Sequence, residues 1–142
     1  MAKITAKYLV KKYKTRNPFE LAKILGVLII YEPLGQIKGY YNTAFRKKMI
    51  HINNGLTEYE QKFTAAHELG HAVLHPKSNT PFLKNQTLFS IDKLEIEANR
   101  FAVELLISDE DITEMKHLTI EQMAAYFGVH KQLIKLRLNI KN

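Results

Sequence analysis

Apolar residues recur with two different periods along the first half of the chain. Residues 3–14 and 18–25 carry them at helical spacing, and Asn17 is a good N-cap for the second of these helices. Three further stretches are β-branched or apolar in short runs, which predicts strands at residues 27–31, 37–45 and 48–52. The last two are expected to form a hairpin, with Arg46 and Lys47 near its tip.

Helical spacing dominates the second half. The capping-box pattern Thr-x-x-Glu at residues 57–60 opens a long helix, and Pro76 stops it after residue 75. A second long helix is expected over residues 92–107, with its cap at residue 90 or 92. Capping patterns also predict shorter helices, which begin at residues 108 and 119.

These elements predict an α+β fold. We expect a small antiparallel β-sheet packed on the pair of long helices, followed by an α-helical C-terminal hairpin. The predicted division of the chain is a first domain over residues 1–108 and a helical segment over residues 109–142. Residues 76–89 contain two prolines and polar residues, which predicts a loop that forms a mobile rim beside a cleft.

The composition narrows the class of protein and of site. Of the 142 residues, 46% are hydrophobic and 25% charged, as in soluble globular proteins. The chain has no cysteine, which excludes disulfides and thiolate metal ligands. Lysines interrupt the N-terminal segment, and no apolar run approaches the roughly 18 residues of a membrane span. We therefore expect a cytoplasmic protein.

The net charge of +7 is concentrated at the ends of the chain. Residues 1–16 hold six basic side chains and no acidic one. A solvated, solubilising face is the simpler interpretation of this run, and contact with nucleic acid or an acidic partner is the alternative.

Residues 67–71 (His-Glu-Leu-Gly-His) carry the strongest chemical signal. On a helix, His67 and His71 lie one turn apart on the same face, so both imidazoles can bind one zinc ion. Glu68 lies about 100° round the helix axis from His67, where it can accept a proton from a water molecule. An ordinary surface helix with these three residues is the alternative, but the apolar surroundings favour a buried site.

A catalytic zinc site needs a third protein ligand. His75 lies about 6 Å further along the same straight helix, so we expect it to support a ligand from behind or to favour the helix dipole. The acidic residues of the second long helix remain as candidates. Glu97 lies on the same broad face as the apolar residues and is the expected ligand, and the alternatives are Glu95 and Asp92.

Other polar residues have weaker signals. Glu104, two turns beyond Glu97, is expected either to orient a histidine or to be solvated. His51 is expected to be structural or exposed, with a place in the cleft as the alternative. Four side chains are candidates to stabilise an oxyanion: Tyr40, Tyr41, Tyr59 and His75.

The stretch HELGHAVLH at residues 67–75, followed by EIEANRF at 95–101, resembles the ImmA/IrrE family of bacterial and phage metallo-endopeptidases. The resemblance covers roughly residues 15–110 and departs at positions 107–108, where Ile-Ser replaces the usual Met-Pro. It implies a gluzincin-like helix pair and, as third zinc ligand, the glutamate before Ala-Asn, which is Glu97. It also implies cleavage of a transcriptional repressor, which derepresses phage, mobile-element or stress genes.

The C-terminal segment resembles a helix-turn-helix unit. Gly128 makes the turn, and three basic residues lie on the expected second helix, Lys131, Lys135 and Arg137. DNA binding is one interpretation, while repressor binding or covering the core is favoured. The sequence thus predicts a zinc-dependent endopeptidase with a protein substrate, and the alternative is a DNA- or repressor-binding adaptor with a structural or inactive zinc site.

Overall fold

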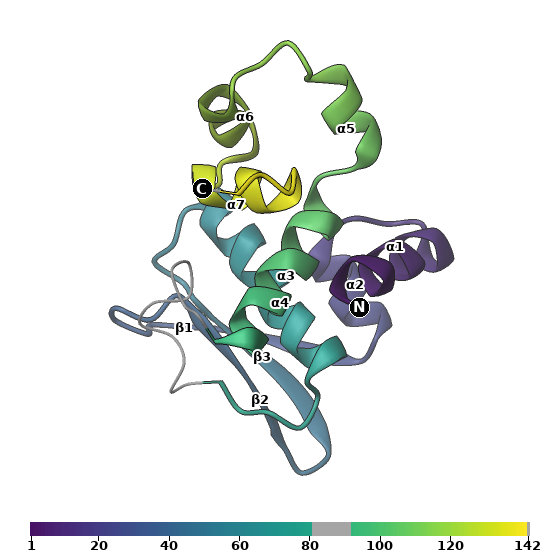
Figure 1. Ribbon diagram of the computed structural model, residues 1–142. Coiled ribbons are helices and arrows are strands. Elements are labelled where there is room, and N and C mark those ends of the chain that lie inside the picture. The colour runs from purple at the N-terminus through teal and green to yellow at the C-terminus, as the bar shows by residue number, and fades with distance from the viewer. Residues whose placement is uncertain (81–91, 142) are drawn as a thin grey trace.

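The computed structural model describes residues 1–80 and 92–141. Within these ranges the helices and strands follow the chain in this order: α1 (Ala2–Tyr13), α2 (Pro18–Ile24), β1 (Val27–Glu32), β2 (Gly39–Ala44), β3 (Lys47–Asn53), α3 (Glu58–Leu74), α4 (Lys93–Leu106), α5 (Asp109–Glu114), α6 (Ile120–Phe127) and α7 (Lys131–Arg137). The α+β class predicted from the sequence is confirmed. Figure 1 shows α3 and α4 side by side at the centre, with the sheet below them, α1 and α2 at one side, and α5–α7 above.

The sheet is mixed, with strand order β1-β3-β2. The expected hairpin is confirmed, since β2 pairs antiparallel with β3 and Phe45 and Arg46 adopt positive φ angles at its turn. However, β1 pairs parallel with β3, so a purely antiparallel sheet was the wrong expectation. Sequence spacing identifies neighbours in a hairpin but does not tell which edge of the hairpin an earlier strand joins.

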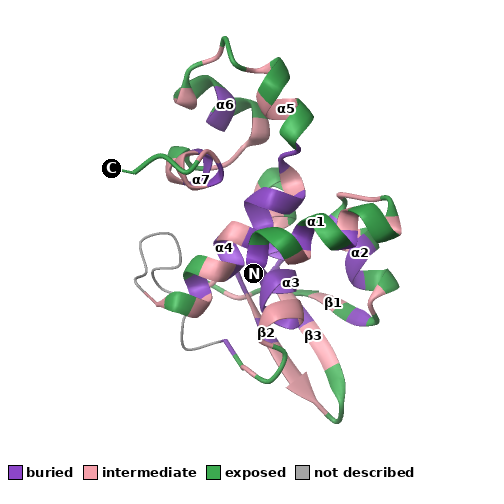
Figure 2. Ribbon diagram, turned by 45° about the vertical axis from the view of Figure 1, so that its right-hand side comes forward, coloured by how far each residue is buried: buried purple, intermediate pink, exposed green. Residues whose placement is uncertain are grey.

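The main core lies between the sheet and the two long helices. Tyr41, Ile50 and Ile52 on the inner face of the sheet are fully buried, as is Leu69 of α3. Gly39 lets β2 approach α3 closely, because a Cβ at this position would lie 2.6 Å from Thr64 Cγ2. Figure 2 shows this buried zone as the purple parts of α3 and α4, whereas α5 and the outer part of α6 are mostly exposed.

The C-terminal helices have a smaller apolar cluster of their own. Its buried members are Ile107, Met123, Ala124 and Ile134. Capping boxes start α5 and α6 as expected, and Gly128 ends α6 in the left-handed conformation. The division of the chain between residues 108 and 109 stays a prediction. None of the helices in the described ranges combines the length and hydropathy needed to cross a membrane.

Candidate metal centre

The helix α3 presents the HExxH residues as the sequence predicts. The Thr57 side chain accepts from the Glu60 backbone N–H, and the Glu60 side chain accepts from the Thr57 N–H, which fixes the start of the helix. The helix ends at its C-cap, His75, directly before Pro76. Both histidines of the motif are buried, with exposures of 2% for His67 and 0% for His71.

Three potential ligand atoms converge between α3 and α4. Glu95 Oε2 lies 3.1 Å from His67 Nε2 and 2.5 Å from His71 Nε2. In the described part of the chain, His67, His71 and Glu95 form a group of metal-binding type whose ligand atoms all lie within 4.8 Å of one another. Two imidazoles and one carboxylate are the ligand set that zinc takes in several catalytic sites.

The hydrogen bonding of His67 favours a cation at this point. His67 Nδ1 lies 2.8 Å from Asn99 Oδ1, an atom that only accepts, so Nδ1 carries a proton and donates it. In a neutral imidazole the Nε2 atom then presents a lone pair toward the Glu95 carboxylate. A cation, either a metal ion or a proton, is needed between two such atoms, so these residues fit a bound metal.

The structure corrects the expected place of Glu97. It is Glu95, fully buried, that lies at the two histidines, whereas the Glu97 side chain is 38% exposed and lies 3.6 Å from His75 Nε2. At about 100° per residue, Glu95 falls near Ala102 and Glu97 near Phe101, on opposite borders of the same apolar face. Helical spacing alone therefore does not decide which of the two carboxylates faces α3. Asp92, the other alternative, is the N-cap of α4, and its side chain accepts from the Leu94 and Glu95 backbone N–H groups.

Gly70 explains how α4 comes close enough to deliver Glu95. A Cβ on Gly70 would lie 3.2 Å from the Cα and O atoms of Ala98 and from Phe101 Cβ. The two helices therefore cross in contact at Gly70 and Ala98, one residue before His71 and three residues after Glu95. The glycine within the motif is thus part of the packing that assembles the site.

Glu68 is held by a residue that sequence reasoning missed. Thr80 Oγ1 lies 3.3 Å from Glu68 Oε1, and both residues are buried. Thr80 is also bonded to Tyr41 of β2. Its N–H donates to Tyr41 O, and its hydroxyl oxygen accepts from Tyr41 N–H. Asn99, the partner of His67, was missed too, although its position four residues after Glu95 places it on the same side of α4.

The tyrosines considered as oxyanion donors lie in different surroundings. The Tyr41 hydroxyl donates to Pro76 O at 2.7 Å, and burial raises its pKa above the usual value. Tyr40 stacks on His51, at 4.2 Å between ring centroids. Burial and the nearby Glu32 carboxylate raise the pKa of Tyr40. Tyr59 is 58% exposed near the start of α3.

His51 is structural, as expected. Its Nδ1 lies 2.6 Å from Glu32 Oε1 and its Nε2 lies 2.8 Å from Asn42 Oδ1, so the ring ties the outer two strands to β3. Most of the predicted rim loop, residues 81–89, and the candidate cap Ser90 lie outside the described residues.

Glu104 and Arg137 form an ion pair with each other. Glu104 was expected near the metal or in solvent, and Arg137 on a DNA-binding surface. Arg137 Nη1 lies 3.6 Å from Glu104 Oε1, and both side chains are almost fully buried. Arg137 also donates to Ile107 O and to Asp109 Oδ1, so it secures α7 to the end of α4. Glu104 therefore neither orients a histidine nor is solvated, and Arg137 is not exposed to a nucleic acid.

Comparison with known proteins decides the family. The profile of the IrrE N-terminal-like domain, Peptidase_M78, matches residues 22–139, which is most of the chain. The chain belongs to this family. It is 45% identical to the uncharacterized immunity region protein 2 of Bacillus phage phi105 over 140 residues, 96% of this chain and 89% of that protein. It is 37% identical to metallopeptidase ImmA of Bacillus subtilis (strain 168) over 126 residues, 84% and 73% of the two chains. This member of the Peptidase_M78 family is a metallopeptidase with a protein substrate, and the resemblance noted in its sequence is confirmed.

Proposed function

We propose that this protein is a zinc-dependent endopeptidase whose metal ligands are His67, His71 and Glu95. The observation that carries the proposal is the convergence of these three side chains beside Glu68. No thiolate is available in the chain, and zinc takes nitrogen and carboxylate ligands of this kind in catalytic sites that keep a position for water. Glu97, predicted as a ligand from the sequence, is replaced by Glu95 in this proposal.

When bound, zinc supplies a Lewis acid that polarises the scissile carbonyl and makes water more acidic. Glu68 is the proposed general base. Its Oε2 lies 3.9 Å from His67 Nε2, so the carboxylate is next to the ligands without being one of the three. One of its oxygens accepts a proton from the attacking water and then transfers it to the leaving amine nitrogen.

Thr80 and Asn99 give this chemistry defined geometry. The Thr80 hydroxyl restricts Glu68, and the Asn99 amide oxygen holds the Nδ1–H tautomer of His67, leaving its Nε2 lone pair for the metal. Because the site is buried, interactions between charges there are weakened less by water than on the surface.

The proposed substrate is a transcriptional repressor, whose cleavage derepresses phage, mobile-element or stress genes. Two relatives support this choice by their names, one an immunity region protein of a phage and the other a metallopeptidase. Arg137, one of the three basic residues considered for DNA binding, is buried in the protein, which removes one contact from a DNA-binding surface on α7.

The test uses the full chain with added zinc and, where a helix-turn-helix repressor is encoded beside this protein, that purified repressor as the candidate substrate. Cleavage detected by mass spectrometry, abolished by a chelator and restored by zinc, is expected. Glu68→Gln is expected to keep zinc stoichiometry and lose about 100-fold or more in rate, the lower range for a general base. Glu58→Gln is the matched control, because Glu58 is exposed at the start of the same helix. Wild-type cleavage by Glu68→Gln would refute the mechanism.

A further inference from the structure

Behind His71, on the side away from Glu95, lie two further residues, His75 and Glu97. His71 Nδ1 lies 3.2 Å from His75 Nδ1, and His75 Nε2 lies 3.6 Å from Glu97 Oε2. His75 is the C-cap of α3 and its side chain is only 10% exposed, while Glu97 comes from α4. The two residues therefore connect a proposed ligand on one helix to a carboxylate on the other.

Only one arrangement of protons satisfies this contact when His71 binds a metal through Nε2. His71 Nδ1 must then carry the ring's proton, and it donates to the Nδ1 lone pair of His75. The remaining proton of neutral His75 is consequently on Nε2. That atom is buried and, among the described residues, has no hydrogen-bond partner.

The Glu97 carboxylate favours this arrangement. Its Oε2 is the negatively charged atom that faces His75 Nε2, so it stabilises a proton there over a lone pair. The opposite tautomer would direct the Nε2 lone pair at the carboxylate and the Nδ1 proton at His71. It would place a proton between the two Nδ1 atoms that His71 cannot accept while donating its own.

We propose that His75 and Glu97 are positioning residues that hold His71 in the tautomer and ring orientation needed for metal binding. This inference rests on the proposed zinc site and assigns roles that differ from direct ligation. His67 receives the same support from a single residue, Asn99, at 2.8 Å. Helix α4 would thus supply one ligand, Glu95, the support of His67 and, through Glu97, the carboxylate that holds His75.

The test measures zinc affinity by competition with a chromophoric chelator, for the full-length protein and its variants. His75→Leu is expected to weaken zinc binding about 10- to 100-fold, the usual effect of removing a group that orients a ligand. His75→Asn is the matched control, because the Asn side-chain oxygen occupies about the position of the imidazole Nδ1 and can accept from His71. It is expected to bind zinc nearly as tightly as the original protein.

The role of Glu97 is tested by comparing the effect of its substitution with and without His75. Glu97→Ala is expected to weaken zinc binding in the original protein and to have no effect in the His75→Asn background, where no Nε2 atom remains to be stabilised. Glu58→Ala controls for the loss of a negative charge on the surface. Nitrogen-15 NMR of the zinc-loaded protein provides a second measurement, in which His71 is expected to show a protonated Nδ1 that loses its hydrogen-bond shift in His75→Leu.

The outcomes separate this inference from the proposed function. If the original protein does not bind zinc, the proposed function is wrong and this inference falls with it. If it binds zinc and His75→Leu and Glu97→Ala bind with the same affinity, the metal site stands and the positioning role is refuted. Circular dichroism of the apo variants checks their folding. A His75→Asn variant that binds as weakly as a folded His75→Leu variant also contradicts the inference, because the acceptor would then not matter.

Discussion

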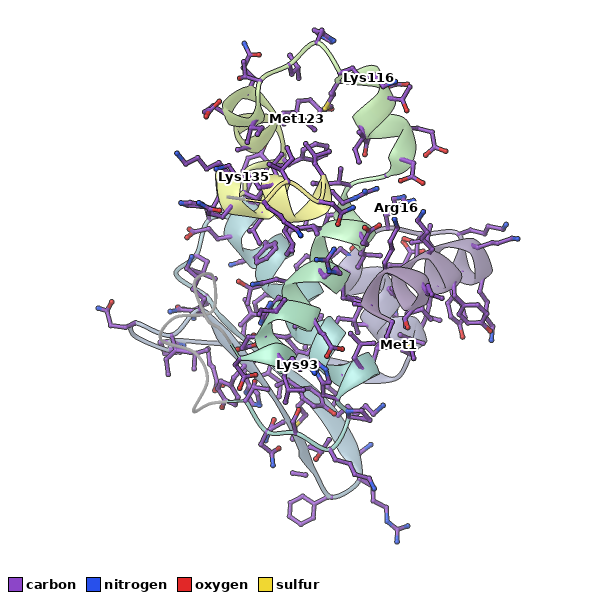
Figure 3. All side chains as sticks on the ribbon, viewed as in Figure 1. Met1, Arg16, Lys93, Lys116, Met123 and Lys135 are labelled. Atoms are coloured by element: carbon purple, nitrogen blue, oxygen red, sulfur yellow. The ribbon has the colours of Figure 1, made fainter. Side chains whose placement is uncertain are left out.

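Helix α4 buries one carboxylate near each of its ends, and the two differ in what neutralises them. Near its start, Glu95 faces two imidazoles, and near its end Glu104 faces the guanidinium of Arg137. Figure 3 helps to locate these ends, because Lys93 marks the start of α4, and Arg16, which donates to the backbone oxygens of Glu104 and Leu105, marks its end. Among the described residues, a guanidinium faces the carboxylate near the end of α4, whereas two imidazoles face the carboxylate near its start.

A buried carboxylate needs a partner of opposite charge or must take up a proton. Arg137 is always protonated, and it completes its contacts with Ile107 O and Asp109, so the Glu104 cluster is a structural connection between α4 and α7. The cluster of Glu95 offers three lone-pair atoms to one point. Similar burial thus serves packing in one place and is suited to metal binding in the other.

The largest expected effect comes from removing a proposed metal ligand. Glu95→Ala should lower zinc affinity by more than the roughly 10- to 100-fold expected for orienting groups. For the original protein, zinc at about 1,000 times its Kd should add about 4 kcal/mol to the free energy of unfolding, and Glu95→Ala should lose most of that gain. Thermal unfolding with zinc and with chelator measures both. An equal zinc-induced shift in the variant would show that Glu95 is not a ligand.

Substitutions in the Glu104 cluster should change the free energy of unfolding but not the zinc affinity. Arg137→Ala leaves Glu104 buried without its cation, and is expected to destabilise the fold by about 3 kcal/mol, with unchanged zinc affinity. Adding Glu104→Gln should recover part of the loss, because the buried charge is removed. Urea unfolding of the single and double variants provides the measurement. A neutral effect of Arg137→Ala would mean that the ion pair contributes nothing to α7 packing.

A third variant tests the close contact between α3 and α4 at Gly70 and Ala98. Gly70→Ala places a Cβ 3.2 Å from backbone atoms of Ala98, so α4 must shift by a few tenths of an ångström. We expect a loss of about 1–2 kcal/mol in stability, as for mild overpacking, and weaker zinc binding because Glu95 moves with α4. Since Ala stabilises an unhindered helix relative to Gly, a more stable variant would show that the crossing is not tight.

The smallest effect concerns the pH dependence of the Arg137 cluster. Hydrogen bonds from Arg137 and Lys7 lower the pKa of Asp109 from 3.8 to about 2. A carboxyl group with a depressed pKa in the folded state stabilises it above the unfolded pKa, and this contribution is lost as the pH falls from about 4 to 2. Asp109 is 63% exposed at its side chain, so Asp109→Asn should cost less than about 1 kcal/mol at pH 7. The difference between the two proteins should vanish below about pH 2 in acid unfolding curves, and a difference that persists there would exclude the ionised carboxylate as its source.

Local signals in the sequence were sufficient to predict the helices and the two histidines of the site. The box at Thr57 and the stop at Pro76 define α3, and the four-residue spacing of His67 and His71 places both rings on one face. The cap at Asn17 and the turn at Gly128 were also recognised, because each depends on a side chain or backbone angle within a few residues.

Tertiary packing decided the features that join distant segments. Glu95 and Glu97 border the same apolar face of α4, and only the contact of Ala98 with Gly70 determines which of them reaches the histidines. Asn99, Thr80 and Arg137 likewise acquire their partners from segments at least 12 residues away in the chain. The sequence by itself therefore determined the helices, their caps and the pair of histidines, since these depend on local spacing. The third carboxylate, the supports of the site and the parallel pairing of β1 with β3 depend on how the helices and strands pack, which local spacing does not encode.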